Sequence, residues 1–193
     1  MSKEAAKTKV GVKPLVMTAM MAAVLCILGP LSIPIGPVPL SLTLVGVYLC
    51  AYTLGSRRGT LAVFLYVLLG AVGLPVFSGF AGGPAKLFGP TGGYIVGFIL
   101  TAFICGYFIE MSERLHSNIK VASLALQLVG MLIGLAACYA LGTIWFSIQA
   151  HVTIAEALGT CVIPFVAFDL IKIALGMALG LTIKRALTAA NLI

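Results

Sequence analysis

The sequence predicts an all-α membrane protein, a bundle of six transmembrane helices with both termini in the cytoplasm. Of its 193 residues, 61% are hydrophobic and 9% are charged, whereas a soluble domain carries about 25% charged residues. Six hydrophobic runs alternate with loops rich in proline, glycine or charge, and a helix of about 20 mostly apolar residues crosses a bilayer. We therefore expect residues 1–193 to form a single integral membrane domain embedded in the lipid bilayer.

Three runs are expected in the first part of the chain. Residues 1–13 form a basic segment, which we place in the cytoplasm, and residues 15–28 follow it without a small-residue cleavage site, so this run is expected to remain as the first helix. Four prolines between residues 30 and 39 exclude a helix there. Residues 40–54 and 60–74 are expected to form the second and third helices, joined by a short loop that contains two arginines.

The remaining runs are residues 94–109, 121–141 and 161–184. The glycine-rich loop at 75–93 predicts sharp turns without a helix or strand, and we expect residues 142–160 to form a second long loop. Each of the last three helices carries a Gly-x-x-x-Gly motif, which lets helix backbones approach closely. We expect these three helices to form the compact half of the bundle.

The positively charged residues predict the orientation. If the N-terminus lies inside, the loops on the opposite side contain Lys86 as their one basic residue. Positive charge concentrates in cytoplasmic loops, so both termini are expected in the cytoplasm. The basic residues on the predicted inner side are Lys3, Lys7, Lys9, Lys13, Arg57, Arg58, Arg114, Lys120, Lys184 and Arg185.

Composition and motifs exclude several classes of protein. The net charge of +7 comes from residues at the ends of hydrophobic runs, so no nucleic-acid partner is expected. The sequence has no phosphate-binding loop, no zinc-protease motif and no nucleophile-elbow motif. His116 and His151 stand alone, and the five cysteines lie in apolar segments without a C-x-x-C pair. We expect neither an enzyme nor a metal site, and no cofactor held by this chain.

The sixth run carries an acid and a base within its apolar stretch. Asp169 and Lys172 are the charged residues between positions 162 and 183, and each costs about 2.5–3.5 kcal/mol at the centre of a spanning helix. A spacing of three places both side chains on one helix face. They form either a site for a polar ligand or a structural ion pair between helices. Well-packed apolar residues often stabilise a protein as well as a buried ion pair does, so we favour a ligand site that opens outward.

The first run has a smooth face made of small residues, Ala19, Ala22 and Ala23. Such a face suits internal packing against a neighbouring helix and docking onto another membrane protein equally well. The residues alone favour neither interpretation.

Three stretches of the sequence stand out in combination: Gly36-Pro37-Val38-Pro39-Leu40-Ser41, Gly89-Pro90-Thr91-Gly92-Gly93-Tyr94 and Asp169-x-x-Lys172. Together they resemble the BioY family, the biotin-specific substrate-binding (S) components of energy-coupling-factor (ECF) transporters. Members of this family usually have threonine and glutamine after the Val-Pro pair, where this chain has Ser41 and Thr43.

The resemblance implies a six-helix S-component in a bacterial cell membrane, which captures biotin from outside with high affinity. It implies as partners a membrane coupling (T) subunit and two cytoplasmic ATPase subunits, which use the ATP. In that family the alanine-rich face of the first helix docks the coupling subunit. This assigns docking to Ala19, Ala22 and Ala23.

The resemblance also implies roles in binding biotin. Asp169 is expected to accept from the ureido N–H groups and Lys172 to contact the ureido carbonyl or position Asp169; the assignment of Lys172 to the valerate carboxylate stays open. That carboxylate is otherwise expected to bind the backbone N–H groups of Gly92 and Gly93, or Lys86. The expected aromatic walls are Tyr94, Phe80, Tyr139 and Trp145.

Two other functions stay open at this point. An S-component for a different vitamin would share the architecture and differ in its pocket. A stand-alone proton- or sodium-coupled transporter would use Asp169 to carry the ion.

Overall fold

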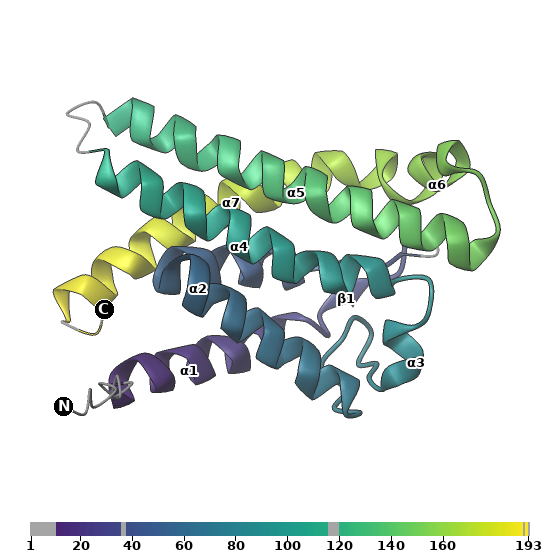
Figure 1. The fold of residues 1–193 in the computed structure, drawn as a ribbon, viewed down its shortest axis with the longest axis horizontal. Helices are drawn as coiled ribbons and strands as arrows, with labels where there is room; N and C mark the ends of the chain where they lie inside the picture. Colours follow the sequence, from purple (N-terminus) through teal and green to yellow (C-terminus); the bar gives the residue numbers. More distant parts are fainter. Residues whose placement is uncertain (1–10, 36–37, 116–119, 191, 193) are drawn as a thin grey trace, which may run out of the picture.

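The structure, a computed structural model, describes residues 11–35, 38–115, 120–190 and 192, and helices make up most of it (Figure 1). The predictions made for residues 1–10, for Gly36 and Pro37, and for His116 concern residues outside this described part. In chain order the elements are α1 (Val12–Leu28), β1 (Ser32–Ile33), β2 (Leu40–Ser41), α2 (Thr43–Ala71), α3 (Pro84–Leu87), α4 (Gly92–Arg114), α5 (Lys120–Ala150), α6 (Ile154–Cys161) and α7 (Ile163–Ala189).

Helix α2 is a hairpin of two helices that meet at Gly55. This residue has φ 74° and ψ −167°, a conformation that is essentially restricted to glycine. The two halves, residues 43–54 and 56–71, run side by side, because Gly59 packs directly against the backbone of Cys50. The Glu110 carboxylate accepts from the N–H of Ser56 at 2.7 Å and so caps the second half. The prediction of two helices is confirmed, but Arg57 and Arg58 belong to the second helix and not to a connecting loop.

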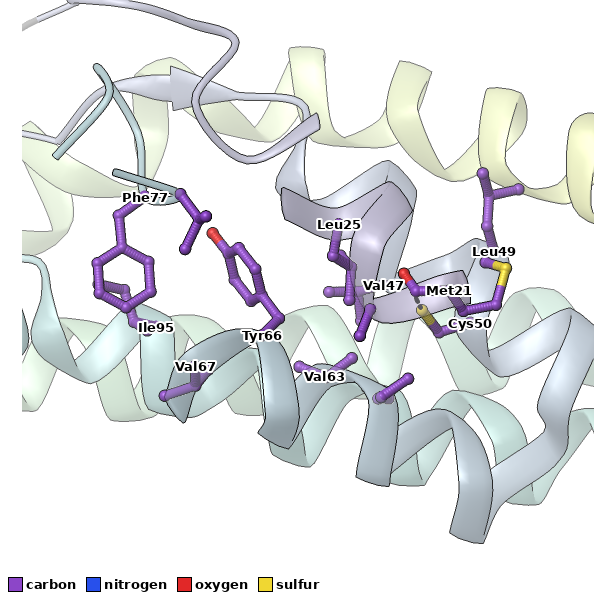
Figure 2. Close-up of a cluster of buried hydrophobic side chains, with 14 residues drawn as sticks. Met21, Leu25, Val47, Leu49, Cys50, Val63, Tyr66, Val67, Phe77 and Ile95 are labelled. Atoms are coloured by element: carbon purple, nitrogen blue, oxygen red, sulfur yellow. Dashed lines mark hydrogen bonds between the residues drawn. The ribbon is translucent and has the colours of Figure 1, made fainter. Parts of the chain in front are cut away.

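A buried apolar cluster holds this hairpin against α1. Figure 2 shows Leu25 of α1 and Val47, Val63 and Tyr66 of the two α2 halves pointing toward one another. Tyr66 also makes an edge-to-face contact with Phe77, with ring centroids 5.6 Å apart. Contacts of this kind stabilise aromatic pairs beyond their burial, so the loop after α2 is fixed to the hairpin.

Glycines set the packing of the later helices. Gly97 of α4 packs on Cys138 of α5, and the Thr101 hydroxyl donates to the carbonyl of Gly134 at 3.0 Å. The predicted close approach of α4 and α5 is confirmed. Gly176 and Gly180 of α7, however, pack against Tyr48 and Tyr52 of α2. The expected compact group of the last three helices is therefore wrong, because α7 lies mainly on α2.

Two of the expected loops contain helices. The loop predicted at 142–160 is wrong: α5 continues to Ala150 and α6 occupies Ile154–Cys161. Helix α6 begins with a capping box in which the Thr153 side chain accepts from the N–H of Glu156, and the Glu156 carboxylate accepts from the N–H of Thr153. In the glycine-rich loop, Pro84 begins the four-residue helix α3, since proline suits the first position of a helix.

The two ends of the bundle differ in content (Figure 1). One end, called here the bend end, holds the start of α1, the bend within α2 and the end of α7. The opposite end, called the α6 end, holds α3 and α6. Among the described residues, α4, Val121–Ala150 of α5 and α7 are long and apolar enough to cross a membrane. The six-span count and the cytoplasmic location of the bend end stay predictions.

Candidate ligand-binding site

A cavity of about 60 Å³ lies between α4, α5, α7 and the segment that leads into α2. This volume has room for roughly four to six water molecules. Most lining side chains are apolar, and the charged ones are Asp169 and Lys172. The lining residues are Val38, Pro39, Leu40, Ser41, Leu44, Tyr94, Phe98, Leu135, Cys138, Tyr139, Cys161, Phe165, Asp169 and Lys172.

Asp169 is the centre of the polar network in this cavity. One of its carboxylate oxygens accepts from the Lys172 ammonium at 2.7 Å, and the other accepts from the Tyr139 hydroxyl at 2.5 Å. The side chains of Asp169 and Lys172 are only 9% and 11% exposed. Hydrogen bonds to ionised groups are about twice as strong as neutral ones. The network therefore joins α5 to α7 and fixes the carboxylate in the cavity.

The helical repeat explains which side chains reach the cavity. On α7, Phe165 precedes Asp169 by four residues and Lys172 follows it by three, so all three share one face. On α5, Leu135 and Tyr139 are likewise four residues apart. The apolar side chains exclude water around the pair, and low local polarity strengthens each hydrogen bond that it makes.

The arrangement suits a small polar ring with both donors and an acceptor. Each Asp169 oxygen has one protein donor and can accept a further hydrogen bond. The Lys172 ammonium has three donors, of which one is directed at Asp169. A ligand with N–H groups and a carbonyl can therefore join the network without leaving either charge unpaired. Because the cavity is small, a bicyclic ligand requires the lining to move outward.

Four of the predicted binding residues meet in this cavity: Asp169, Lys172, Tyr94 and Tyr139. They come from α4, α5 and α7, which lie far apart in the sequence. The Tyr94 hydroxyl lies 3.5 Å from that of Thr143, and the Tyr94 ring packs on Gly142. These contacts hold the ring at the cavity wall.

The other predicted binding residues lie outside the lining. Phe80 is 68% exposed on the loop after α2, and Lys86 belongs to α3. The Trp145 indole donates to the carbonyl of Gly89 at 2.9 Å, so it fixes the glycine-rich loop to α5. The Trp145 side chain also covers Gly93. A Cβ added at Gly93 would lie 2.3 Å from the Cβ of Trp145.

Gly92 does not provide the free donor that the sequence suggested. Its N–H already donates to the carbonyl of Gly89 at 3.0 Å. A Cβ at this position would also lie 1.6 Å from the carbonyl oxygen of Leu87. Glycine is required here for the close approach of the loop, which explains the motif in structural terms.

Several lining residues were missed by the sequence reasoning. Phe98 lies four residues after Tyr94, and Phe165 lies four residues before Asp169, so the helical spacing was an available signal. Cys138 and Cys161, which lie in apolar segments of the sequence, are both buried free thiols. They also line the cavity, which composition alone did not indicate.

One buried hydroxyl lacks a hydrogen-bond partner among the residues that the structure describes. Tyr48 is fully buried one turn after the lining residue Leu44, and its ring packs on Gly176. In the part of the chain that the structure describes, the Tyr48 hydroxyl is the one buried side-chain oxygen that makes no hydrogen bond. Among the same residues no group of three potential metal ligands occurs.

The alanine face of α1 has two sides. Ala22 is 4% exposed and packs in the core, as the packing interpretation predicts. Ala19 and Ala23 are exposed, and together with Ala22 they line an apolar groove of about 560 Å³ between α1 and the second half of α2. The groove has no charged lining residue.

Comparisons with known proteins agree with this architecture. A solved structure described as the S-component for biotin from an ECF-type ABC transporter superimposes with a TM-score of 0.80 at 32% identity, covering 94% of this chain and 95% of the other. The biotin transporter BioY of Thermotoga maritima is 46% identical over 155 residues, covering 80% of this chain and 86% of the relative. BioY2 of Lactococcus lactis is 36% identical over 177 residues, covering 92% and 93%.

The family profile extends the match to nearly the whole chain. The profile of the BioY family matches residues 1–189. These relatives are named as transporters or transporter components and not as enzymes. A transporter is expected to have the apolar helices that this chain has. From the family match, the high identity to its members and the shared fold, we conclude that this integral membrane protein belongs to the BioY family.

Proposed function

We propose that this chain is the substrate-capture subunit for biotin in an ECF-type vitamin transporter. The observation that carries the proposal is the buried Asp169 carboxylate, which Lys172 and Tyr139 hold in a mostly apolar cavity. The relatives named as biotin transporters and the biotin S-component of the same fold support the choice of ligand.

The chemistry of biotin matches the cavity. The ureido ring has two N–H donors and one carbonyl acceptor, which correspond to the free capacity of Asp169 and Lys172. Phe98, Leu135 and Phe165 supply apolar walls for the fused ring. Gly92 is removed as a donor to the valerate carboxylate, since its N–H already donates to Gly89, which leaves Gly93 and Lys86 as the candidates. Lys172 bound to that carboxylate, with the ring reversed, is the second binding mode that the network permits.

The partners in this proposal are a membrane coupling subunit and two cytoplasmic ATPase subunits. These subunits use the ATP, and the chain itself needs no cofactor. Ala19, Ala22 and Ala23 line an uncharged apolar groove, and small residues let a partner helix approach closely, so we place the coupling subunit there. The chain is then one integral membrane domain of a bacterial cell membrane, with six spans and both termini in the cytoplasm.

Isothermal titration of the detergent-purified protein with biotin, thiamine and riboflavin tests the choice of ligand. The proposal predicts tight binding of biotin without any ion gradient and no measurable binding of the other two vitamins. Tight binding of another vitamin instead would identify an S-component of different specificity.

A second experiment tests the class of transporter. Proteoliposomes that contain this chain alone should show no biotin uptake driven by a proton or sodium gradient, because in our account the partners supply the energy. Gradient-driven uptake would favour the ion-coupled alternative with Asp169 as the ion carrier.

A further inference from the structure

A second hollow lies at the bend end, far from the biotin cavity. Its volume is about 610 Å³, and it lies between the hairpin bend of α2 and the last turns of α4. Its lining residues are Leu54, Ser56, Arg57, Arg58, Phe103, Tyr107, Glu110 and Arg114. We call this region the arginine hollow.

The arginine hollow carries an excess of positive charge. Three guanidinium groups line it with one carboxylate, that of Glu110. This carboxylate is already used at the start of the second half of α2, where it accepts from the N–H of Ser56 at 2.7 Å and from its hydroxyl at 3.0 Å. Within the described chain, Arg57 and Arg58 have no carboxylate at ion-pair distance, and both are exposed. The hollow is therefore suited to an anion.

The face of α4 toward the hollow changes from aromatic to cationic along its length. Phe103, Tyr107, Glu110 and Arg114 follow one another at spacings of four, three and four, so they lie on one face of the helix. Phe103 and Tyr107 are 47% and 51% exposed. From Phe103 to Arg114 the helix rises about 16 Å, which is enough to pass from the hydrocarbon layer to the lipid headgroups.

The neighbouring helix repeats this order. On the second half of α2, Leu61 and Phe64 follow Arg57 by four and seven residues, so they share its face, and they are 44% and 43% exposed. Gly106 of α4 packs directly on Ser56, which holds the two helices together at this point. Both helices thus present cations at the bend end and exposed apolar side chains toward the middle of the bundle.

We propose that the arginine hollow binds the phosphate headgroup of an anionic phospholipid, with an acyl chain lying along the exposed face of α4 and the second half of α2. Guanidinium groups bind phosphate oxygens through paired hydrogen bonds. Basic pockets between membrane helices are suited to anionic headgroups, and tyrosine is favoured at the level between headgroup and hydrocarbon. The order of cation, aromatic ring and aliphatic side chain matches the order of phosphate, glycerol and acyl chain. A free phosphate would use the arginines alone.

Native mass spectrometry of the detergent-purified protein with added phosphatidylglycerol or phosphatidylcholine tests this proposal. The wild type should retain phosphatidylglycerol in preference to phosphatidylcholine. Arg57→Gln should lower that retention about fivefold, the contribution of one basic residue at an anionic lipid surface. Arg185→Gln is the matched control, since Arg185 is an exposed arginine of α7 outside the hollow, and it should retain the lipid as the wild type does.

The remaining outcomes overturn the proposal. Equal retention of the two lipids by the wild type would show a nonspecific lipid belt, and this comparison needs no variant. Equal losses in Arg57→Gln and Arg185→Gln would show an effect of net charge. Displacement of the lipid by an equal concentration of glycerol phosphate would show that the arginines bind a soluble phosphate. Biotin titration of both variants verifies their folding, because neither residue lines the biotin cavity.

Discussion

Lys172 supplies the ammonium that pairs with Asp169 in the cavity, at 2.7 Å. The change Lys172→Met keeps the stem of the side chain and leaves the buried carboxylate with Tyr139 alone. We expect biotin affinity to fall by at least about 30-fold, since Lys172 contacts the ligand in both proposed binding modes and loss of a buried charged partner across an interface costs about 2–5 kcal/mol. Lys184→Met is the control, a lysine of the same helix that does not line the cavity. Titration calorimetry compares the two, and equal losses would contradict the assignment of Lys172.

A substitution at Tyr48 is expected to raise stability and to leave biotin affinity unchanged. Its fully buried hydroxyl has no hydrogen bond among the described residues, and an unsatisfied buried polar group costs about 1–3 kcal/mol. Tyr48→Phe should therefore raise the unfolding temperature in detergent without biotin, while biotin affinity stays the same. A loss of biotin affinity in this variant would show that the hydroxyl takes part in binding.

At the scale of elements, the bend in α2 depends on Gly55. The change Gly55→Ala introduces a Cβ at φ 74°, only 2.2 Å from a carboxylate oxygen of Glu110. Strained backbone of this kind costs about 1–3 kcal/mol, and displacement of Glu110 removes the cap on Ser56 as well. Gly55→Ala should lower the unfolding temperature and the yield of folded protein.

Gly159→Ala is the matched control for this change. Gly159 lies in α6, and no atom is within 4 Å of a Cβ placed there. Alanine stabilises a helix by about 0.5–1 kcal/mol relative to glycine, so the unfolding temperature should stay equal or rise. Similar losses in both variants would contradict a special role for the bend.

The sequence predicted most of the helices but not all of their partners. The hairpin followed from the apolar runs on both sides of Gly55, and close packing of α4 and α5 followed from their glycines. Helix α6 was missed although Thr153 and Glu156 have the spacing of a capping box. The position of α7 on α2 was missed because a small-residue motif identifies a helix face and not the helix that packs on it.

At the scale of the whole molecule, the site could be predicted only in part. Asp169 and Lys172 stood out because charge is costly in an apolar run, and Tyr94 and Tyr139 reached the same cavity. Phe98 and Leu135 look like ordinary core residues in the sequence. Their place in the cavity depends on how α4 and α5 are rotated against α7, which only the folded structure shows.

The orientation of the molecule gives a prediction of its own. With the bend end in the cytoplasm, Phe80→Cys at the α6 end should react with a membrane-impermeant maleimide in intact cells. Arg185→Cys at the bend end should react only after the cells are opened. Both positions are exposed, whereas none of the five native cysteines is exposed. Labelling of the wild-type protein therefore measures the background reaction. The reverse pattern would contradict the positive-inside assignment.

The central claim is that Asp169 binds biotin directly, and calorimetric titration of Asp169→Asn with biotin tests it most directly. Glu156→Gln is the matched control, an exposed acid of α6 that does not line the cavity. We predict that Asp169→Asn lowers biotin affinity by at least about 30-fold, while Glu156→Gln binds as the wild type does. An Asp169→Asn protein that unfolds more easily but keeps its biotin affinity would contradict the account and leave the buried pair a purely structural role.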